Sequence, residues 1–133
     1  MDAVQEVYEF LKKCGTWYLA TVEGDQPRVR PFGAIAILDG KLATQTGHIK
    51  AVSKQLDANP KAEICGFTGG EWIRIACKLI EDPSIETQEA MLDANPNLKR
   101  MYKAGDGNTE ILIFTDATAT ISSFGGEPRV LTF

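Results

Sequence analysis

The chain has 133 residues and a formal net charge of −4. This length suits a single domain, residues 1–133, that can bury roughly two thirds of its unfolded surface. Hydrophobic residues make up 44% and charged residues 24% of the sequence, a balance that excludes a disordered chain. The acidic balance argues against a general nucleic-acid or anionic-membrane binder, because phosphate groups are met by basic surfaces. Any positively charged binding site must therefore be confined to a small part of the surface.

In chain order, the pattern of apolar residues predicts helices and strands in one small domain. The first element is an amphipathic helix over residues 2–13, which Gly15 can stop. The later elements are strands over 16–23, 28–38 and 41–46, a helix ending near 59–60, a hairpin of 61–68 and 71–81, a helix over 84–95, and strands over 110–124 and 129–133. Six or seven strands with helices at the edges predict an antiparallel barrel.

The three cysteines, Cys14, Cys65 and Cys77, form an odd set without CxxC spacing. This pattern argues against a disulfide framework and against a zinc site. The sequence shows neither a charged-apolar-small leader nor an apolar run long enough to span a membrane. We therefore expect a cytoplasmic protein that does not interact with membranes.

The only histidine, His48, leaves a small catalytic repertoire. No GxSxG, HExxH or GxxxxGK[ST] motif accompanies it. On its own, His48 is interpreted as a polar surface residue and not as a metal ligand, so no metal site is expected. If the protein does chemistry, we expect a bound cofactor to supply it.

The segment TQTGHIKAVSKQL joins a predicted strand to a predicted helix and indicates an anion site. Helix N-termini attract anions because their first N–H groups lack internal partners and the helix dipole is positive there. In this segment Thr46 can cap the helix or donate its hydroxyl, and Gly47 allows a ligand close to the backbone. A phosphate between Lys50 and Lys54 would turn their mutual repulsion into attraction. The alternative is that both lysines are solvated.

A second positive segment is RVRPFG, in which Arg28, Arg30 and Phe32 share one face by alternation. Pro31 cannot donate to a strand ladder, so the strand is expected to be interrupted or to lie at a sheet edge there. Free backbone groups beside Pro31 could then contact a ligand. The alternative is that the two arginines pair with surface carboxylates.

Three stretches carry a resemblance to a known family: YLATVEGDQPRVRPFGAI, DGKLATQTGHIKAVSKQLDANPKAEIC and GEWIRIACKLIED, roughly residues 17 to 82. Their order resembles the FMN-binding split-barrel superfamily, the pyridoxamine 5'-phosphate oxidase-like proteins. The chain also resembles the short, single-domain members grouped with nitroimidazole-resistance proteins. The resemblance implies a mainly β fold with flanking helices, a six-stranded antiparallel split β-barrel, in a homodimer with FMN at the subunit interface.

The resemblance also implies roles for individual residues. The implied contacts are Arg30, Pro31 and Phe32 along the flavin ring, Gln45 and Thr46 by the ring and the ribityl-phosphate chain, and Lys50 and Lys54 near the phosphate. Trp72, in the matching GEWIRI strand, could face the flavin or the dimer contact, or be an ordinary buried aromatic residue.

The implied function is that of an FMN-dependent oxidoreductase acting on an unknown small substrate. The oxidase proper has a C-terminal segment containing Arg and His for its substrate, whereas EPRVLTF has no histidine. True pyridoxamine phosphate oxidation is therefore not expected. Two alternatives remain open: a non-catalytic FMN electron carrier or storage protein, and a haem-binding split-barrel protein.

Overall fold

The computed structural model describes residues 1–133 as three α-helices, one 3-10 helix and eight strands. In chain order these are α1 (Ala3–Cys14), β1 (Trp17–Glu23), β2 (Gln26–Phe32), β3 (Ala36–Leu38), β4 (Lys41–Gly47), α2 (Ala51–Ala58), β5 (Lys61–Thr68), β6 (Glu71–Asp82), α3 (Ile85–Ala94), the 3-10 helix η1 (Pro96–Arg100), β7 (Thr109–Ser123) and β8 (Arg129–Thr132). No helix is both long enough and apolar enough to cross a membrane.

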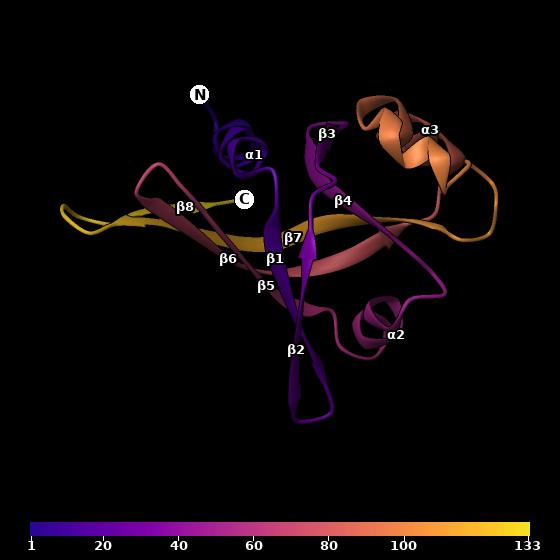
Figure 1. Cartoon of the computed structure of the whole chain (residues 1–133), viewed down its shortest axis with the longest axis horizontal. Helices are drawn as coiled ribbons and strands as arrows, with labels where there is room; N and C mark the ends of the chain where they lie inside the picture. The colour runs from indigo at the N-terminus through magenta and orange to yellow at the C-terminus, as the bar shows by residue number, and fades with distance from the viewer.

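The strands form one antiparallel sheet in the order β2-β1-β5-β6-β7-β4-β3, with β8 paired to the second half of β7. Strand β7 has 15 residues, so its first part can pair with β4 while its later part pairs with β8. The long β6–β7 pair crosses the molecule, with α3 on one side and α2 on the other (Figure 1). The mainly antiparallel β fold is thus confirmed, but the expected count of six strands is wrong. The sheet has eight strands and is not closed.

The strand count differs partly because the predicted strand 28–38 is two strands. The chain bends between β2 and β3, where a side chain on Gly33 would meet the carbonyl oxygen of Gly15 at 3.2 Å. The carbonyl of Ala34 accepts a hydrogen bond of 2.7 Å from the Thr44 hydroxyl instead of joining a ladder. Pro31 lies within β2, an edge strand, as its missing N–H requires.

A capping residue and a turn sequence determine where α1 begins and where the β3–β4 hairpin turns. Asp2 caps α1 by accepting a 2.8 Å hydrogen bond from the backbone N–H of Gln5. Asp39 and Gly40 both have positive φ, 51° and 75°, the combination that a tight two-residue hairpin turn requires. This turn sets the register of β3 against β4 and brings β4 into the sheet beside β7.

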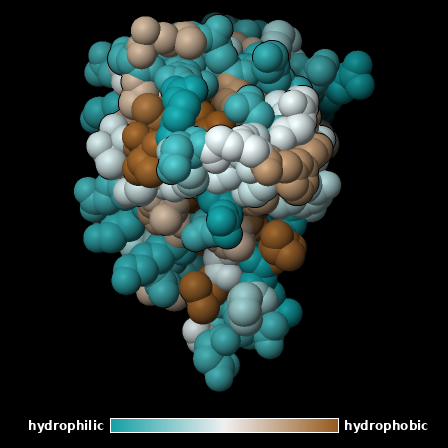
Figure 2. Space-filling view, turned by 90° about the vertical axis from the view of Figure 1, so that its left-hand side faces the viewer, coloured by the Kyte–Doolittle hydropathy of each residue, from teal (hydrophilic) through white to brown (hydrophobic).

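Two apolar clusters lie on the two faces of the sheet. The larger, of 19 buried residues, includes Trp17, Leu19 and the buried face of α1. The smaller, of six buried residues, lies under α3 and includes Ala43 of β4 and Ile111 of β7. Figure 2 shows that apolar groups on the face at the left of Figure 1 lie among hydrophilic ones and do not form one continuous patch.

The helix after β4 begins later than its apolar spacing predicts. Helix α2 starts at Ala51, with Lys50 as an extended N-cap residue whose side chain makes no capping bond. The spacing of Ile49, Val52 and Leu56 at i, i+3 and i+7 predicts a helix that buries Ile49, but Ile49 lies before α2 and is 78% exposed. Thr46 lies in β4 and does not cap the helix.

Candidate functional site

Gln45 of β4 is a buried polar residue in an otherwise apolar row. Its cross-strand partner is Ile111, and Ala43, two residues earlier on the same face, is opposite Ile113. Gln45 is 6% exposed, and neither its amide nitrogen nor its amide oxygen has a hydrogen-bond partner. A buried amide without partners costs free energy, commonly about 1 to 3 kcal/mol. An arrangement of this kind is typical of a position that a ligand completes.

Gln45 faces a cavity of about 220 Å³ between the end of β2, the end of β4 and the segment around η1. The residues that line it are Pro31, Phe32, Gly33, Ala34, Gln45, Thr46, Lys50, Asn97, Leu98, Met101 and Tyr102. This lining contains one cation and no carboxylate or imidazole. The cavity can therefore hold an apolar ring, form hydrogen bonds with an amide-like edge and pair with one anionic group.

The structure brings five of the nine predicted cofactor contacts to this cavity: Pro31, Phe32, Gln45, Thr46 and Lys50. They come from β2, from β4 and from the N-cap of α2.

Gly47 is beside the cavity, at the end of β4. A Cβ added there would lie 3.2 Å from the ring of Tyr102 and 3.0 Å from the side chain of Asn108. Only glycine therefore lets β4 end this close to the Tyr102 ring.

Arg30 points away from the cavity and stabilises the fold through hydrogen bonds to β1 and α2. Its guanidinium donates to the carbonyl of Leu19 (3.2 Å), the hydroxyl of Thr21 (2.7 Å) and the side-chain oxygen of Gln55 (2.6 Å). Burial, and then the neighbouring charge of Arg28, lower the pKa of Arg30. Arg28 pairs with Glu23 at 2.8 Å on the surface, which confirms for that residue the alternative of pairing with a surface carboxylate.

The last two predicted residues, Lys54 and Trp72, lie elsewhere. Lys54 lines a separate hollow of about 340 Å³ that includes Glu23 and Asn59. Trp72 is at the far end of β6 from the cavity, where it pairs across the ladder with Phe67 and contacts Phe124 at a ring-centroid distance of 5.0 Å.

Besides Gly33 and Ala34 in the bend after β2, four lining residues were not predicted from the sequence: Asn97, Leu98, Met101 and Tyr102. They lie in or just after η1, a 3-10 segment without the helical period that directs sequence analysis. The one usable signal in the sequence is Tyr102, an aromatic residue between the predicted helix 84–95 and the predicted strand 110–124; its side chain is only 8% exposed.

Two larger hollows lie away from this cavity. One, of about 630 Å³, lies between α1 and Arg129 of β8, and the other, of about 530 Å³, lies across β1, β5 and β6. Neither includes a buried side chain whose amide or hydroxyl lacks a partner. We therefore take the Gln45 cavity as the candidate site.

The chain was compared with known proteins. A sequence model of the family described as pyridoxamine 5'-phosphate oxidase matches residues 3–90. A NimC/NimA family protein from Clostridium acetobutylicum is 44% identical, has a TM-score of 0.95, and the match covers 98% of this chain and 92% of that chain. No curated protein matches. The chain therefore belongs to the pyridoxamine 5'-phosphate oxidase-like family.

Two more distant solved structures share the fold. A haem-binding protein from Mycobacterium smegmatis has a TM-score of 0.76 at 14% identity, covering 99% of this chain and 58% of that chain. A pyridoxamine 5'-phosphate oxidase-related, FMN-binding protein from Nostoc punctiforme has a TM-score of 0.68 at 16% identity, covering 98% of this chain and 94% of that chain. Proteins with this fold thus include both FMN binders and a haem binder, so the fold alone does not choose the cofactor.

Proposed function

We propose that the protein binds FMN in the Gln45 cavity and acts, as a homodimer, as a flavin-dependent oxidoreductase on a small substrate. The observation that carries the proposal is the buried, unpartnered amide of Gln45 in the cavity wall. The pyrimidine edge of a flavin presents carbonyl acceptors beside an N–H donor, so one amide can both donate to it and accept from it. Membership of the family and the FMN-binding neighbour from Nostoc support this choice of cofactor.

The residues of the cavity fit the other parts of FMN. Pro31 and Phe32 supply an apolar wall for a ring system, and Lys50 is the one cation available to a phosphate. FMN, when bound, supplies the electron-transfer chemistry that no side chain here provides. The role proposed for this chain is to bind and orient the cofactor, with Lys50 and Tyr102 the titratable side chains of the lining.

A second copy of the chain is proposed to complete the site. The cavity of about 220 Å³ is smaller than the roughly 300 Å³ at which small-molecule pockets begin. The sheet face beside it is apolar and open: Tyr18, Val29 and Phe67 are 51%, 69% and 60% exposed, and the ladder register puts them on one face. Pro31 of the cavity is the cross-strand neighbour of Tyr18. A partner on this face would therefore cover the mouth of the cavity.

Haem is the second candidate ligand, favoured by Met101 and Tyr102 in the cavity wall. Methionine and tyrosine can both serve as axial haem ligands. His48, the more usual ligand, is not in the lining and instead bonds to Glu81 and Gly107. The buried amide of Gln45 does not ligate haem iron, whereas it can form hydrogen bonds with the pyrimidine edge of a flavin. FMN is therefore the preferred ligand.

Within the family, we propose an activity other than pyridoxamine phosphate oxidation. Strand β8, the last element, pairs with residues Thr118–Ile121 of β7, whereas the cavity adjoins the Gln45–Ile111 pair near the opposite end of β7. Within one chain the C-terminal residues therefore do not contribute to the cavity. A substrate must be recognised by other groups.

The direct test is the absorption spectrum of the purified protein after incubation with FMN and, separately, with haem, each followed by desalting. Retained flavin bands, with one FMN per chain, support the proposal. A retained Soret band without flavin absorption would instead select haem. Oxidation of NADH or NADPH with reduction of a small electrophile then separates an enzyme from an electron carrier.

A further inference from the structure

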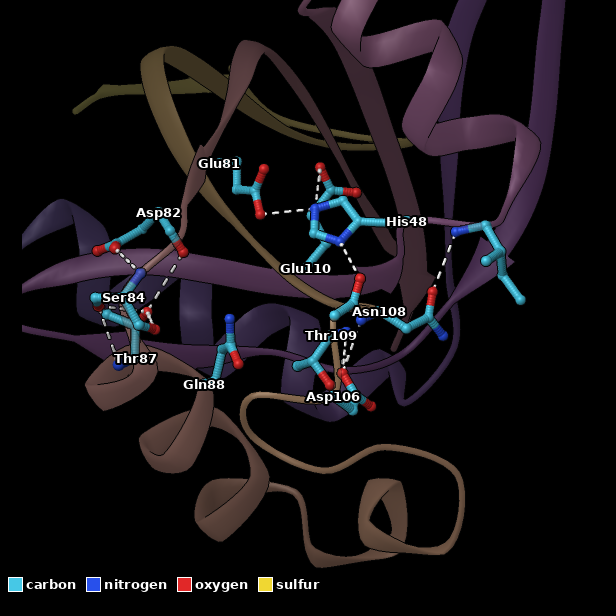
Figure 3. A network of polar contacts seen from close by, with 12 residues as sticks. His48, Glu81, Asp82, Ser84, Thr87, Gln88, Asp106, Asn108, Thr109 and Glu110 are labelled. Atoms are coloured by element: carbon cyan, nitrogen blue, oxygen red, sulfur yellow. Dashed lines mark hydrogen bonds and ion pairs between the residues drawn. The ribbon is translucent and has the colours of Figure 1, made fainter.

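His48, Glu81 and Glu110 meet at one point although they come from three separate segments (Figure 3). The imidazole Nε2 of His48 lies 2.8 Å from Oε2 of Glu81 and 3.8 Å from Oε2 of Glu110. One nitrogen and two carboxylate oxygens, one from each residue, all lie within 4.8 Å of one another. These side chains do not line the Gln45 cavity.

A hydrogen bond at the other ring nitrogen of His48 fixes the orientation of the imidazole ring. Its Nδ1 lies 3.2 Å from the backbone carbonyl of Gly107, which can only accept a hydrogen bond. Nδ1 therefore donates to this carbonyl, and a metal ion would take the place of the proton through which Nε2 bonds to Glu81. A histidine whose one nitrogen donates to a backbone carbonyl, while the other nitrogen faces the remaining ligands, is the usual arrangement of a metal-binding imidazole.

Glu110 supplies the second, independent observation. Its side chain is 1% exposed, and its Oε1 has no hydrogen-bond partner. No lysine or arginine forms an ion pair with Glu81 or Glu110. The hydroxyl of Thr46, the direct cross-strand neighbour of Glu110, is also buried without a partner. A metal cation at this point would offset the cost of burying the Glu110 carboxylate, whose one ion-pair partner is His48.

The spacing of the three ligand atoms is close to the spacing that a metal ion needs. Bonds of about 2.0 to 2.2 Å in a tetrahedral site put ligand atoms roughly 3.4 Å apart. The observed 2.8 and 3.8 Å separations bracket this value, so small side-chain rotations suffice. A hollow of about 230 Å³ lined by Glu81 and Glu110 adjoins the cluster and leaves room for water ligands.

We propose that His48, Glu81 and Glu110 form a binding site for a divalent first-row transition-metal ion, with water from the adjoining hollow completing the coordination. One imidazole with two carboxylates suits Mn²⁺, Fe²⁺ or Zn²⁺, whereas Mg²⁺ and Ca²⁺ prefer oxygen ligands alone. The site joins the turn after β4 to β6 and β7, and it does not depend on the flavin proposal.

Mn²⁺ is the best probe, because Zn²⁺ would also bind the thiols of Cys14 and Cys65. His48 is the only histidine, so its imidazole signals in an NMR spectrum are unambiguous. Paramagnetic Mn²⁺ added to chelator-treated, ¹⁵N-labelled protein should broaden these signals first, with one ion bound per chain and a rise in Tm. Glu110→Gln and Glu81→Gln should each weaken Mn²⁺ binding roughly tenfold or more.

The matched control is Asp116→Asn, which removes an exposed carboxylate from β7 that pairs only with Lys78. It should bind Mn²⁺ as the wild type does. The proposal is overturned if His48 signals broaden no sooner than those of other surface residues, or if both glutamine variants, shown to be folded by their melting curves, bind Mn²⁺ with wild-type affinity.

Discussion

Gln45 shows how a single buried side chain can indicate function better than the sequence around it. Its amide lies in an apolar row between β4 and β7 and finds no partner within the chain. A protein selected for stability alone would place an apolar side chain there. Replacing Gln45 with Met, which has similar length and no amide, should therefore raise the free energy of unfolding of the ligand-free protein by about 1 kcal/mol.

The same substitution should weaken FMN binding roughly tenfold or more, since it deletes a donor and an acceptor at once. Denaturant melts of the apoprotein and fluorescence titration with FMN measure the two effects. Greater stability with unchanged FMN affinity would mean that Gln45 does not contact the flavin.

Arg30 leads to the opposite prediction, a role in stability. It donates to Leu19, Thr21 and Gln55, so it ties β2 to β1 and to α2. Arg30→Met should lower the free energy of unfolding by about 2 kcal/mol, because it also leaves the buried oxygen of Gln55 with one donor fewer. The control Arg28→Met breaks only the exposed pair with Glu23 and should cost less than about 0.5 kcal/mol. Equal losses in both variants would contradict the assignment.

At the level of single residues, sequence analysis found the cavity only in part. The order of the LAT, PRVRP and TGHIK stretches indicated Pro31, Phe32, Gln45, Thr46 and Lys50, which the structure brings to one cavity. It could not show that Arg30 turns inward, because Thr21 and Gln55 are brought to it only by the β1–β2 and β1–α2 contacts. Nor could it bring His48 to Glu81 and Glu110, which are far from it in sequence.

Among the elements, the loop between η1 and β7 is held by Asp106 (Figure 3). Its carboxylate accepts hydrogen bonds from the backbone N–H groups of Lys103, Asn108 and Thr109, at 3.0, 2.8 and 2.7 Å. These bonds, with that of Thr109 foremost, hold the pKa of Asp106 well below its usual range. A lowered carboxyl pKa contributes stability above the unfolded-state pKa, about 3.9, and that stability is lost as the pH falls towards the folded-state pKa.

Asp106→Asn should therefore lower Tm by a few degrees at pH 7. The difference from wild type should shrink as the pH falls below about 4, where the wild-type carboxylate begins to lose its advantage. Thermal melts from pH 7 down to pH 3 measure this. A difference that grows as the pH falls would contradict the assigned role of the carboxylate.

Elements with strong local signals were predicted well and those without were not. The helices predicted over 2–13 and 84–95 are confirmed as α1 and α3, which begin at the capping residues Asp2 and Ser84. The break between β2 and β3 depends on the close approach of Gly33 to Gly15, a contact that no local pattern reveals. The late start of α2 has a similar origin, because the backbone N–H groups of His48 and Ile49 donate to Asn108.

At the scale of the whole molecule, an FMN site that a second copy completes requires a dimer formed through the open sheet face. Phe67 is 60% exposed on that face, near the end of β5 and opposite Trp72 of β6. Phe67→Asp should convert a dimer at micromolar concentration into a monomer and weaken FMN binding at least roughly tenfold, since a buried charge opposes association. Sedimentation equilibrium with and without FMN measures both.

Ile85→Asp, on α3 and 44% exposed, changes an apolar surface residue on another side of the molecule and serves as the control. It should remain a dimer. A wild-type protein that is monomeric and still binds one FMN per chain tightly would contradict the shared site.

The central claim, that the Gln45 cavity holds FMN with its phosphate at Lys50, is tested most directly by comparing FMN with riboflavin. Isothermal titration of the apoprotein should show tighter binding of FMN, because riboflavin lacks the phosphate. Lys50→Ala should remove about 1.5 to 3 kcal/mol of that preference. Lys54→Ala, which alters a different hollow, should leave most of the preference for FMN over riboflavin unchanged. Equal affinity of the wild type for FMN and riboflavin, or a loss confined to Lys54→Ala, would contradict the account.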